Sequence, residues 1–288
     1  MQGSKASKPW RMDFDAGSLN EVLTFVEQYV SMNSFVRPTL NEEFVETATL
    51  LPNRILAEIE VATRSLLTEP KRPIGKLVVV TGLSKAGKET QMTDPLGHDG
   101  VTSLTDWFTQ RNYRVSISRT SFDGMTGGLI ACFLGRAHEV LFPTGSMDRN
   151  LAWILWSLER ARRSARAGEW LSQDERNVLL AKRWTESNLV YHSVWGVEAS
   201  RILGFERNIL KPDCILNLDV SVESVRQRKE ASSSPSPAWS EEETVSIGKS
   251  FLELHELYPF GSFYSVDANR PPSEVNGSLL DILGGLFP

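Results

Sequence analysis

The residues most able to do chemistry in this chain lie in one short segment that follows an apolar run. Two glycines, Gly82 and Gly87, stand five positions apart, and Lys88 follows at once. This spacing is typical of a phosphate-binding loop, in which successive backbone N–H groups wrap around an anion and the lysine ammonium reaches the outer phosphates. A glycine at the first position permits a turn that a Cβ would obstruct. The segment therefore predicts a cradle for nucleotide phosphates, formed by Gly82, Ser84, Lys85, Ala86, Gly87, Lys88, Glu89 and Thr90.

The residue after the lysine departs from the usual pattern. A phosphate loop commonly continues with Ser or Thr, whose hydroxyl binds magnesium, whereas this chain has Glu89, with Thr90 one step later. Carboxylate oxygen is a ligand that Mg²⁺ favours, so we predict Glu89 and Thr90 as metal ligands. The same carboxylate could instead repel a triphosphate in a desolvated loop. A glycine turn without any ligand is disfavoured, because the apolar strand that the mechanism requires comes just before it.

Composition and charge exclude several classes of protein. The 288 residues carry a net charge of −5, which argues against a nucleic-acid-binding protein with a basic surface. The two cysteines, Cys132 and Cys214, are not clustered, so we expect a reducing compartment and neither a disulfide framework nor a zinc site. No apolar stretch has the length of a membrane span. The N-terminal segment lacks the hydrophobic core of a secretion signal and soon turns acidic, at Asp13 and Asp15, so we expect a cytoplasmic location, with a mitochondrial presequence as the alternative.

The elements that must position the loop divide the chain near residue 74. Residues 1–74 show helical periodicity and two capping signals, so they predict a helical extension that packs on the main domain or binds a protein partner. Residues 75–288 alternate strands with helices, which is typical of a parallel sheet covered on both faces. The predicted fold is therefore three-layer α/β, with a five-stranded parallel sheet. We predict its strands at 76–81, 113–118, 177–182, 213–219 and 263–267.

The segments between the strands predict helices and one flexible loop. The helix that starts in the loop should be short, because Pro95, Gly97 and Gly100 soon follow Thr90. Residues 231–238 are rich in Ser and Pro and predict a flexible loop. Further helices are predicted at 101–111, 127–140, 147–167, 185–207, 221–231 and 240–256.

Basic and aromatic residues recur near the ends of the later strands. Arg119 lies just past the second strand, and Arg183 follows the third. Trp156 and Arg160 are four residues apart, so they share one face of a predicted helix. Ligands of open α/β sheets bind at the carboxyl ends of the strands, where these residues gather. The remaining landmarks are Lys182, Trp184, Ser187, Tyr191 and the sequence KPDCILNLDV at 211–220.

In this order the landmarks resemble the thymidylate kinase family of nucleoside monophosphate kinases, over about residues 76–286. The resemblance implies a P-loop NTPase fold, ATP and Mg²⁺ as cofactors, and transfer of the ATP γ-phosphoryl group to a monophosphate, with dTMP as the first candidate acceptor. It implies a lid at about 229–245 and, as in other members, a homodimer. The implied catalytic residues are Lys85, Lys88, Lys182 and Arg183. The implied acceptor-binding residues are Arg119, Trp156, Arg160, Arg183, Ser187 and Tyr191.

Three departures from the family pattern leave alternatives open. Ser84 stands where the family usually has an Asp that holds the acceptor sugar, Glu89 replaces a metal-binding hydroxyl residue, and Lys182 replaces an Asp. Lys88 and Lys182 together could neutralise phosphate without a metal. The chain is then an active kinase, a degenerate kinase-fold protein that binds nucleotide or a protein partner, or a kinase for another acceptor. Among single residues, Trp156 could be an ordinary core aromatic and Arg183 a structural ion-pair residue.

Overall fold

The computed structural model of the protein describes residues 61–62, 64–93, 95, 98–119, 149–231 and 239–287. The predictions for most of residues 1–74, for the helix at 127–140 and for the centre of the loop at 231–238 lie outside these ranges. The described end of the N-terminal part packs on the main domain, because Ala62 is buried and the Asn208 amide donates to the Leu66 carbonyl oxygen at 2.8 Å. No helix in the described ranges combines the length and the apolar character that a bilayer crossing requires.

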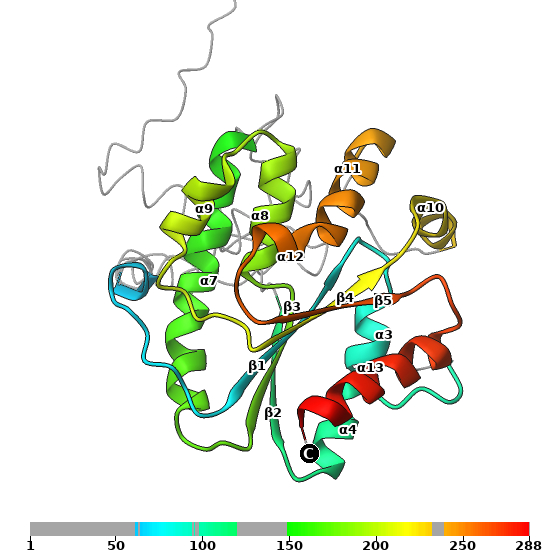
Figure 1. The fold of residues 1–288 in the computed structure, drawn as a ribbon, viewed down its shortest axis with the longest axis horizontal. Coiled ribbons are helices and arrows are strands. Elements are labelled where there is room, and N and C mark those ends of the chain that lie inside the picture. The colour runs from blue at the N-terminus through cyan, green and yellow to red at the C-terminus, as the bar shows by residue number, and fades with distance from the viewer. Residues whose placement is uncertain are drawn as a thin grey trace, which may run out of the picture.

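The centre of the fold is a five-stranded, all-parallel sheet (Figure 1). Its spatial order is β2-β3-β1-β4-β5, so β1 lies in the middle with β3 and β4 as neighbours. The predicted number of strands and their positions are confirmed to within one residue at each end. The strands are β1 (Lys76–Gly82), β2 (Arg114–Arg119), β3 (Asn177–Lys182), β4 (Cys214–Asp219) and β5 (Ser262–Asp267).

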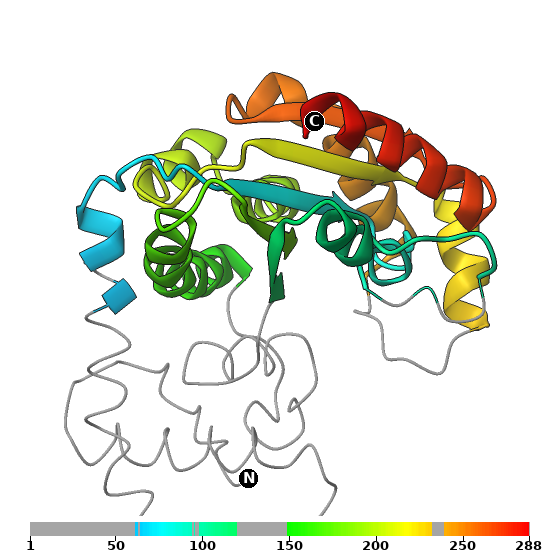
Figure 2. The ribbon, with the colours of Figure 1, turned by 90° about the horizontal axis from the view of Figure 1, so that it is seen from below.

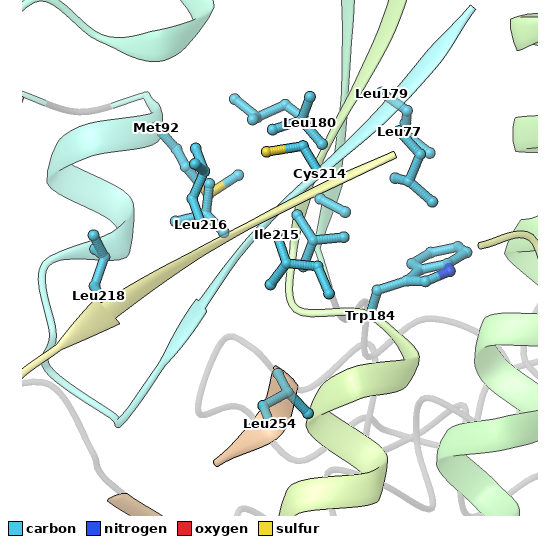
Figure 3. Close-up of a cluster of buried hydrophobic side chains, with 14 of the residues drawn as sticks. Leu77, Met92, Leu179, Leu180, Trp184, Cys214, Ile215, Leu216, Leu218 and Leu254 are labelled. Atoms are coloured by element: carbon cyan, nitrogen blue, oxygen red, sulfur yellow. The ribbon is translucent and has the colours of Figure 1, made fainter. Parts of the chain in front are cut away.

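The strands are formed by apolar residues because both faces of the sheet are covered. The side chains of β1 from Leu77 to Val80 have no exposed surface, and those of β3 and β4 are nearly all buried as well. Figure 3 shows Leu77, Leu180, Ile215 and Leu216 in this core, with Trp184 beside them. The Trp184 indole N–H donates to the Leu210 carbonyl oxygen at 2.7 Å, so its one polar atom is satisfied inside the core.

Helices cover the sheet in two layers (Figures 1 and 2). One face carries α3 (Lys88–Met92), α4 (Leu104–Gln110) and α13 (Pro272–Leu286). The opposite face carries α7 (Arg149–Leu171), α8 (Thr185–Val194) and α11 (Glu241–Leu252). The remaining helices are α9 (Ala199–Phe205), α10 (Val222–Glu230) and α12 (Leu254–Leu257).

The predicted helix at 185–207 is wrong, because the chain forms two helices there, α8 and α9. Gly196 adopts a φ of +86°, and the backbone N–H groups of Gly196 and Val197 close the end of α8 onto Ser193 and His192. Glycine in this conformation is a common helix terminator.

The predicted helix at 240–256 is likewise divided, into α11 and α12, by Glu253. We predicted no helix after the last strand, and α13 corrects this. Its signal was present in the sequence, as Pro272 in the first turn and buried Val275, Leu279 and Leu283 at helical spacing.

The short helix α3 is held by its neighbours rather than by its own length. It ends after five residues, as predicted from the Pro and Gly that follow it. The Gln91 amide donates to the Pro272 carbonyl oxygen at 2.9 Å, and the buried Asn276 amide donates to Gln91 at 2.9 Å. Asn276 also pairs with the backbone of Thr102, so α13 ties α3 to the segment before α4. A single helical turn is unstable alone, so these tertiary contacts keep α3 in place.

We expect Gly82→Ala to lower the free energy of unfolding by at least about 2 kcal/mol. Gly82 has a φ of +120°, and a Cβ there would lie 2.4 Å from the Leu218 carbonyl oxygen in β4. Gly168→Ala is the matched control, because Gly168 lies within α7 and nothing stands within 4 Å of its would-be Cβ. The control should stabilise by about 0.5–1 kcal/mol. Urea denaturation measures both, and equal effects of the two substitutions would contradict the close approach of β1 and β4.

Candidate functional site

The loop between β1 and α3 has an unusual backbone conformation. Three of its residues have positive φ, namely Gly82 at +120°, Lys85 at +64° and Gly87 at +91°. Positive φ is strained for a residue with a side chain, so the backbone of Lys85 is held in an unfavourable conformation by its surroundings. Alternation of left- and right-handed residues turns successive N–H groups to one side and forms an anion-binding concavity. Gly87 is also the residue from which α3 starts.

Lys88 is the buried cation of this loop. Only 5% of its surface is exposed, and its Nζ donates to the carbonyl oxygens of Gly82, at 3.1 Å, and Leu83. Burial lowers the pKa of Lys88 well below its ordinary value, and the positive charges of Arg183 and Lys182 lower it further. An anion in the loop would favour the charged ammonium and offset these effects. Lys88 is therefore poised to bind an anion.

Glu89 is surrounded by cations. Its Oε2 accepts from the Lys182 ammonium at 2.6 Å, and its Oε1 forms an ion pair with the Arg119 guanidinium and accepts from the Thr93 hydroxyl at 3.1 Å. Burial alone would raise the pKa of Glu89, but the hydrogen bond and charge of Lys182, with Thr93 and Arg119, lower it below its ordinary value. The second residue of α3 thus binds two basic side chains, from β3 and β2.

This arrangement does not fit a magnesium ion at Glu89. Mg²⁺ is usually bound by one or two carboxylates together with substrate phosphates. Both oxygens of Glu89 already accept from basic side chains, and these cations would repel a divalent ion. Within the described ranges, no group of three or more His, Cys, Asp or Glu side chains could hold a metal ion. The role of Glu89 and Thr90 as metal ligands stays a prediction, and the surroundings of Glu89 argue against it.

Arg183 lies between the loop and the helices beyond β3. Its backbone N–H donates to the Val80 carbonyl oxygen at 3.0 Å, and its φ of +69° turns the chain from β3 into α8. Its guanidinium lies 5.0 Å from the Tyr191 ring centroid and 3.3 Å from the Ser187 hydroxyl. Ser187 in turn pairs with the Thr81 hydroxyl at 3.0 Å. The structure therefore brings Arg183, Ser187 and Tyr191 together beside the carboxyl end of β1.

Two predicted site residues, Trp156 and Arg160, lie on α7. Trp153 is 3% exposed and belongs to the core, whereas Trp156 is half-buried, with its ring centroid 5.6 Å from that of His192. Arg160 is 3% exposed, and among the described residues its Nη1 has no hydrogen-bond partner. Burial lowers the pKa of Arg160, nearby carboxylates headed by Glu206 oppose this shift, and Arg183 adds to it. Arg160 is thus a buried guanidinium with one unused donor.

Other predicted residues lie at the same edge of the sheet. Arg119 ends β2 opposite Lys182 in β3, so both reach Glu89 from adjacent strands. Ser84, Ala86 and Thr90 belong to the loop and the first turn of α3. The predicted lid at 229–245 lies partly outside the described residues.

Sequence reasoning missed two contacts of the loop. The Arg228 guanidinium in α10 donates to the Lys85 carbonyl oxygen at 3.1 Å and to that of Ala268 at 2.8 Å, so it joins the loop to the end of β5. Glu186 is fully buried and accepts from the Trp184 backbone N–H and the Ser187 hydroxyl. No spacing in the sequence joins Arg228 to the loop. Glu186 has a local signal, because an acid in the first turn of α8 suits the positive end of the helix dipole.

We expect Lys182→Met to raise the pKa of Glu89, because it removes the hydrogen bond and the charge that lower it most. A carboxyl whose pKa is lowered by folding stabilises the native state at neutral pH and loses that effect as the pH falls through its pKa. The variant should therefore lose less stability on acidification than the wild type. NMR titration of the carboxyl carbons measures the pKa, and Lys249→Met, from the exposed pair with Glu253, is the control. An unchanged pKa of Glu89 in Lys182→Met would contradict the ion pair.

We compared the chain with known proteins and solved structures. No protein-family model matches the chain. Among curated proteins, a "Probable thymidylate kinase" of Thermococcus kodakarensis is 24% identical over 187 residues, which cover 63% of this chain and 85% of that protein. A "Probable thymidylate kinase" of Thermococcus gammatolerans is 23% identical over 188 residues, or 65% and 86% of the two chains. The "Thymidylate kinase" of Arabidopsis thaliana is 24% identical over 158 residues, or 54% and 53%.

A solved structure shares the fold. The thymidylate kinase of Candida albicans, described as revealing the origin of broad substrate specificity, superposes with a TM-score of 0.57 at 18% identity. The superposition covers 73% of this chain and 92% of that one. The solved structure thus shows the shared fold, and the similar curated proteins, together with the order of the landmarks, support a divergent member of the thymidylate kinase family.

Proposed function

We propose that this chain is a nucleoside monophosphate kinase that transfers the γ-phosphoryl group of ATP to a pyrimidine deoxynucleotide, with dTMP as acceptor and dTDP as product. One observation carries the proposal. The Arg183 guanidinium lies 3.3 Å from the Ser187 hydroxyl, which pairs at 3.0 Å with Thr81 at the end of β1, and its positive charge lowers the pKa of both Lys88 in the loop and Arg160 in α7. A single cation thus acts on a residue proposed for the donor and on one proposed for the acceptor, as stabilisation of a phosphoryl group in transfer would require.

The donor side of the proposal is the loop. Its backbone N–H groups and Lys88 would hold the ATP phosphates, and the Lys88 ammonium would exchange the carbonyl oxygens of Gly82 and Leu83 for phosphate oxygens. Lys85 is the proposed cationic finger, because the family supplies such a group from the loop or the lid and this lid is acidic at Glu241–Glu243. Phosphoryl transfer depends on positioning and charge neutralisation, which these cations supply.

The acceptor side is the surface of α7 and α8. Arg183 and Arg119 would bind the acceptor phosphate, and Ser187 and Tyr191, in contact with or beside Arg183, would line the sugar. Trp156 and Arg160 would bind the base. Trp156 is half-buried, so its ring could stack on a base, and the Nη1 of Arg160 is a donor that a base carbonyl could use.

A second candidate is a degenerate member that binds nucleotide without transferring phosphate. It is favoured by the ion pair of Lys182 with Glu89, at two positions where the family carries an acid and a hydroxyl. The helix α3, at five residues, also adds only a small dipole to the loop. Both features weaken the usual machinery for the metal but leave the anion cradle in place.

An assay of ADP release with ATP and a panel of monophosphates tests the proposal. We expect turnover with dTMP above that with dCMP, GMP or AMP. Thermal unfolding with the same nucleotides is measured in parallel, because a ligand that binds only the native state raises the melting temperature. Folded protein that shows no turnover with any monophosphate, yet is stabilised by ATP, would replace the proposal with the second candidate.

We expect Arg183→Lys to lower kcat/KM for dTMP by about 10²–10³-fold, because an ammonium cannot reproduce the planar guanidinium beside Ser187 and Tyr191. Arg114→Lys is the control, since Arg114 starts β2 at the opposite edge of the sheet and pairs with exposed Asp174. Its kcat/KM should equal that of the wild type. Steady-state kinetics of the two variants decide the matter, and equal activity in Arg183→Lys would remove Arg183 from the proposed site.

A further inference from the structure

The ion pair between Lys182 and Glu89 is the feature of this edge that the proposed phosphoryl transfer leaves unexplained. Lys182 is the last residue of β3, directly opposite Val80 in β1 and Arg119 in β2. Glu89 follows Lys88 in the chain. The two side chains are about equally accessible, at 35% and 38%, and their charged atoms are 2.6 Å apart. The pair thus lies beside the anion cradle and at its surface, within reach of a ligand.

We propose that the Lys182 ammonium replaces the divalent cation in the binding of a nucleotide polyphosphate, and that Glu89 holds this ammonium in place. The inference rests on the proposed nucleotide site. Its consequence is that the loop binds the phosphates of ADP or ATP without magnesium.

Charge is the first argument for this assignment. Lys88, Lys182, Arg119 and Arg183 lie at the ends of neighbouring strands or in the loop. Glu89 pairs with Lys182 and Arg119, and the carboxylates whose charges act on Lys88 are Glu186 and Glu89. Glu186 is buried and engaged by Trp184 and Ser187, so its charge is already committed to the protein. The remaining excess of positive charge suits a polyphosphate anion, and it opposes the approach of a free divalent cation.

The geometry of Glu89 is the second argument. A metal-binding carboxylate offers at least one free oxygen, whereas both oxygens of Glu89 accept from side chains, Oε2 from Lys182 and Oε1 from Arg119 and Thr93. Three elements, β2, β3 and α3, therefore hold this carboxylate. Such a carboxylate restricts where the Lys182 ammonium lies, and an ammonium held beside the cradle can donate its other hydrogens to phosphate oxygens.

The short helix is the third argument. A long helix after the loop would add the field of its dipole to the cradle, but α3 has one turn and a half of residues before it ends at Thr93. Fixed side-chain cations are the remaining source of positive potential. Lys182 and Arg183, which are consecutive in the chain, supply it from the end of β3.

Calorimetric titration with ADP, once in excess EDTA and once in excess MgCl₂, tests the inference. For the wild type we expect the dissociation constants of ADP in the two buffers to agree within about threefold. For the double variant Glu89→Ser with Lys182→Asp we expect the affinity for ADP in EDTA to fall by at least about tenfold. Magnesium should restore the affinity of this variant. The matched control is Asp174→Ser with Arg114→Asp, the same kinds of change in an exposed ion pair at the opposite edge of the sheet. It should bind ADP like the wild type in both buffers.

Wild-type protein that binds ADP in MgCl₂ but not in EDTA would overturn the inference and leave the proposed kinase function standing. Folded wild-type protein that binds ADP in neither buffer would overturn both. If the double variant does not fold, Lys182→Met replaces it, because methionine keeps much of the side-chain volume without the charge. A tenfold weaker affinity of Lys182→Met in EDTA supports the assignment, and an unchanged affinity overturns it.

Discussion

The pairing of β1 with β3 on one side and β4 on the other is the constraint on which the rest of this structure depends. It places Gly82 against Leu218 and Val80 against Lys182, so the loop, the cations after β3 and the end of β4 meet at one edge. Each of these strands is buried on both faces, so a shift of one residue would move apolar side chains and charges together. The site is therefore built by the register of the core rather than by the loop alone.

Burial at this edge sets the electrostatics of the site. Lys88, Arg160 and Glu186 are all buried, although the transfer of a charged side chain from water to the protein interior is unfavourable. The charge of Glu186 favours the charged forms of Lys88 and Arg160, whereas the like charge of Arg183 disfavours both. A phosphate group entering this region would meet cations whose desolvation has already occurred on folding, which is the arrangement that electrostatic catalysis and tight anion binding both require.

The residues at positions 89 and 182 distinguish this chain from the pattern of thymidylate kinases that it resembles. A strand-end acid and a hydroxyl would cooperate around a divalent ion, whereas a strand-end lysine and a glutamate neutralise each other. In this protein the two side chains form an internal ion pair beside the proposed phosphate loop, and Arg119 and Thr93 complete the cluster.

The sequence by itself determined the strands, the parallel α/β class, the position of the loop and the early end of α3. These depend on local apolar runs, on glycine and on proline, which act within a few residues. It also placed Arg119, Lys182 and Arg183 at strand ends, but not their partners. The tertiary structure alone decided that Lys182 and Arg119 both bind Glu89, that Arg228 reaches the Lys85 carbonyl oxygen, and that Asn276 supports α3. Those contacts join residues that are 30 to 185 positions apart in the chain. Only the packing of the helices on the sheet brings such distant groups within hydrogen-bonding distance.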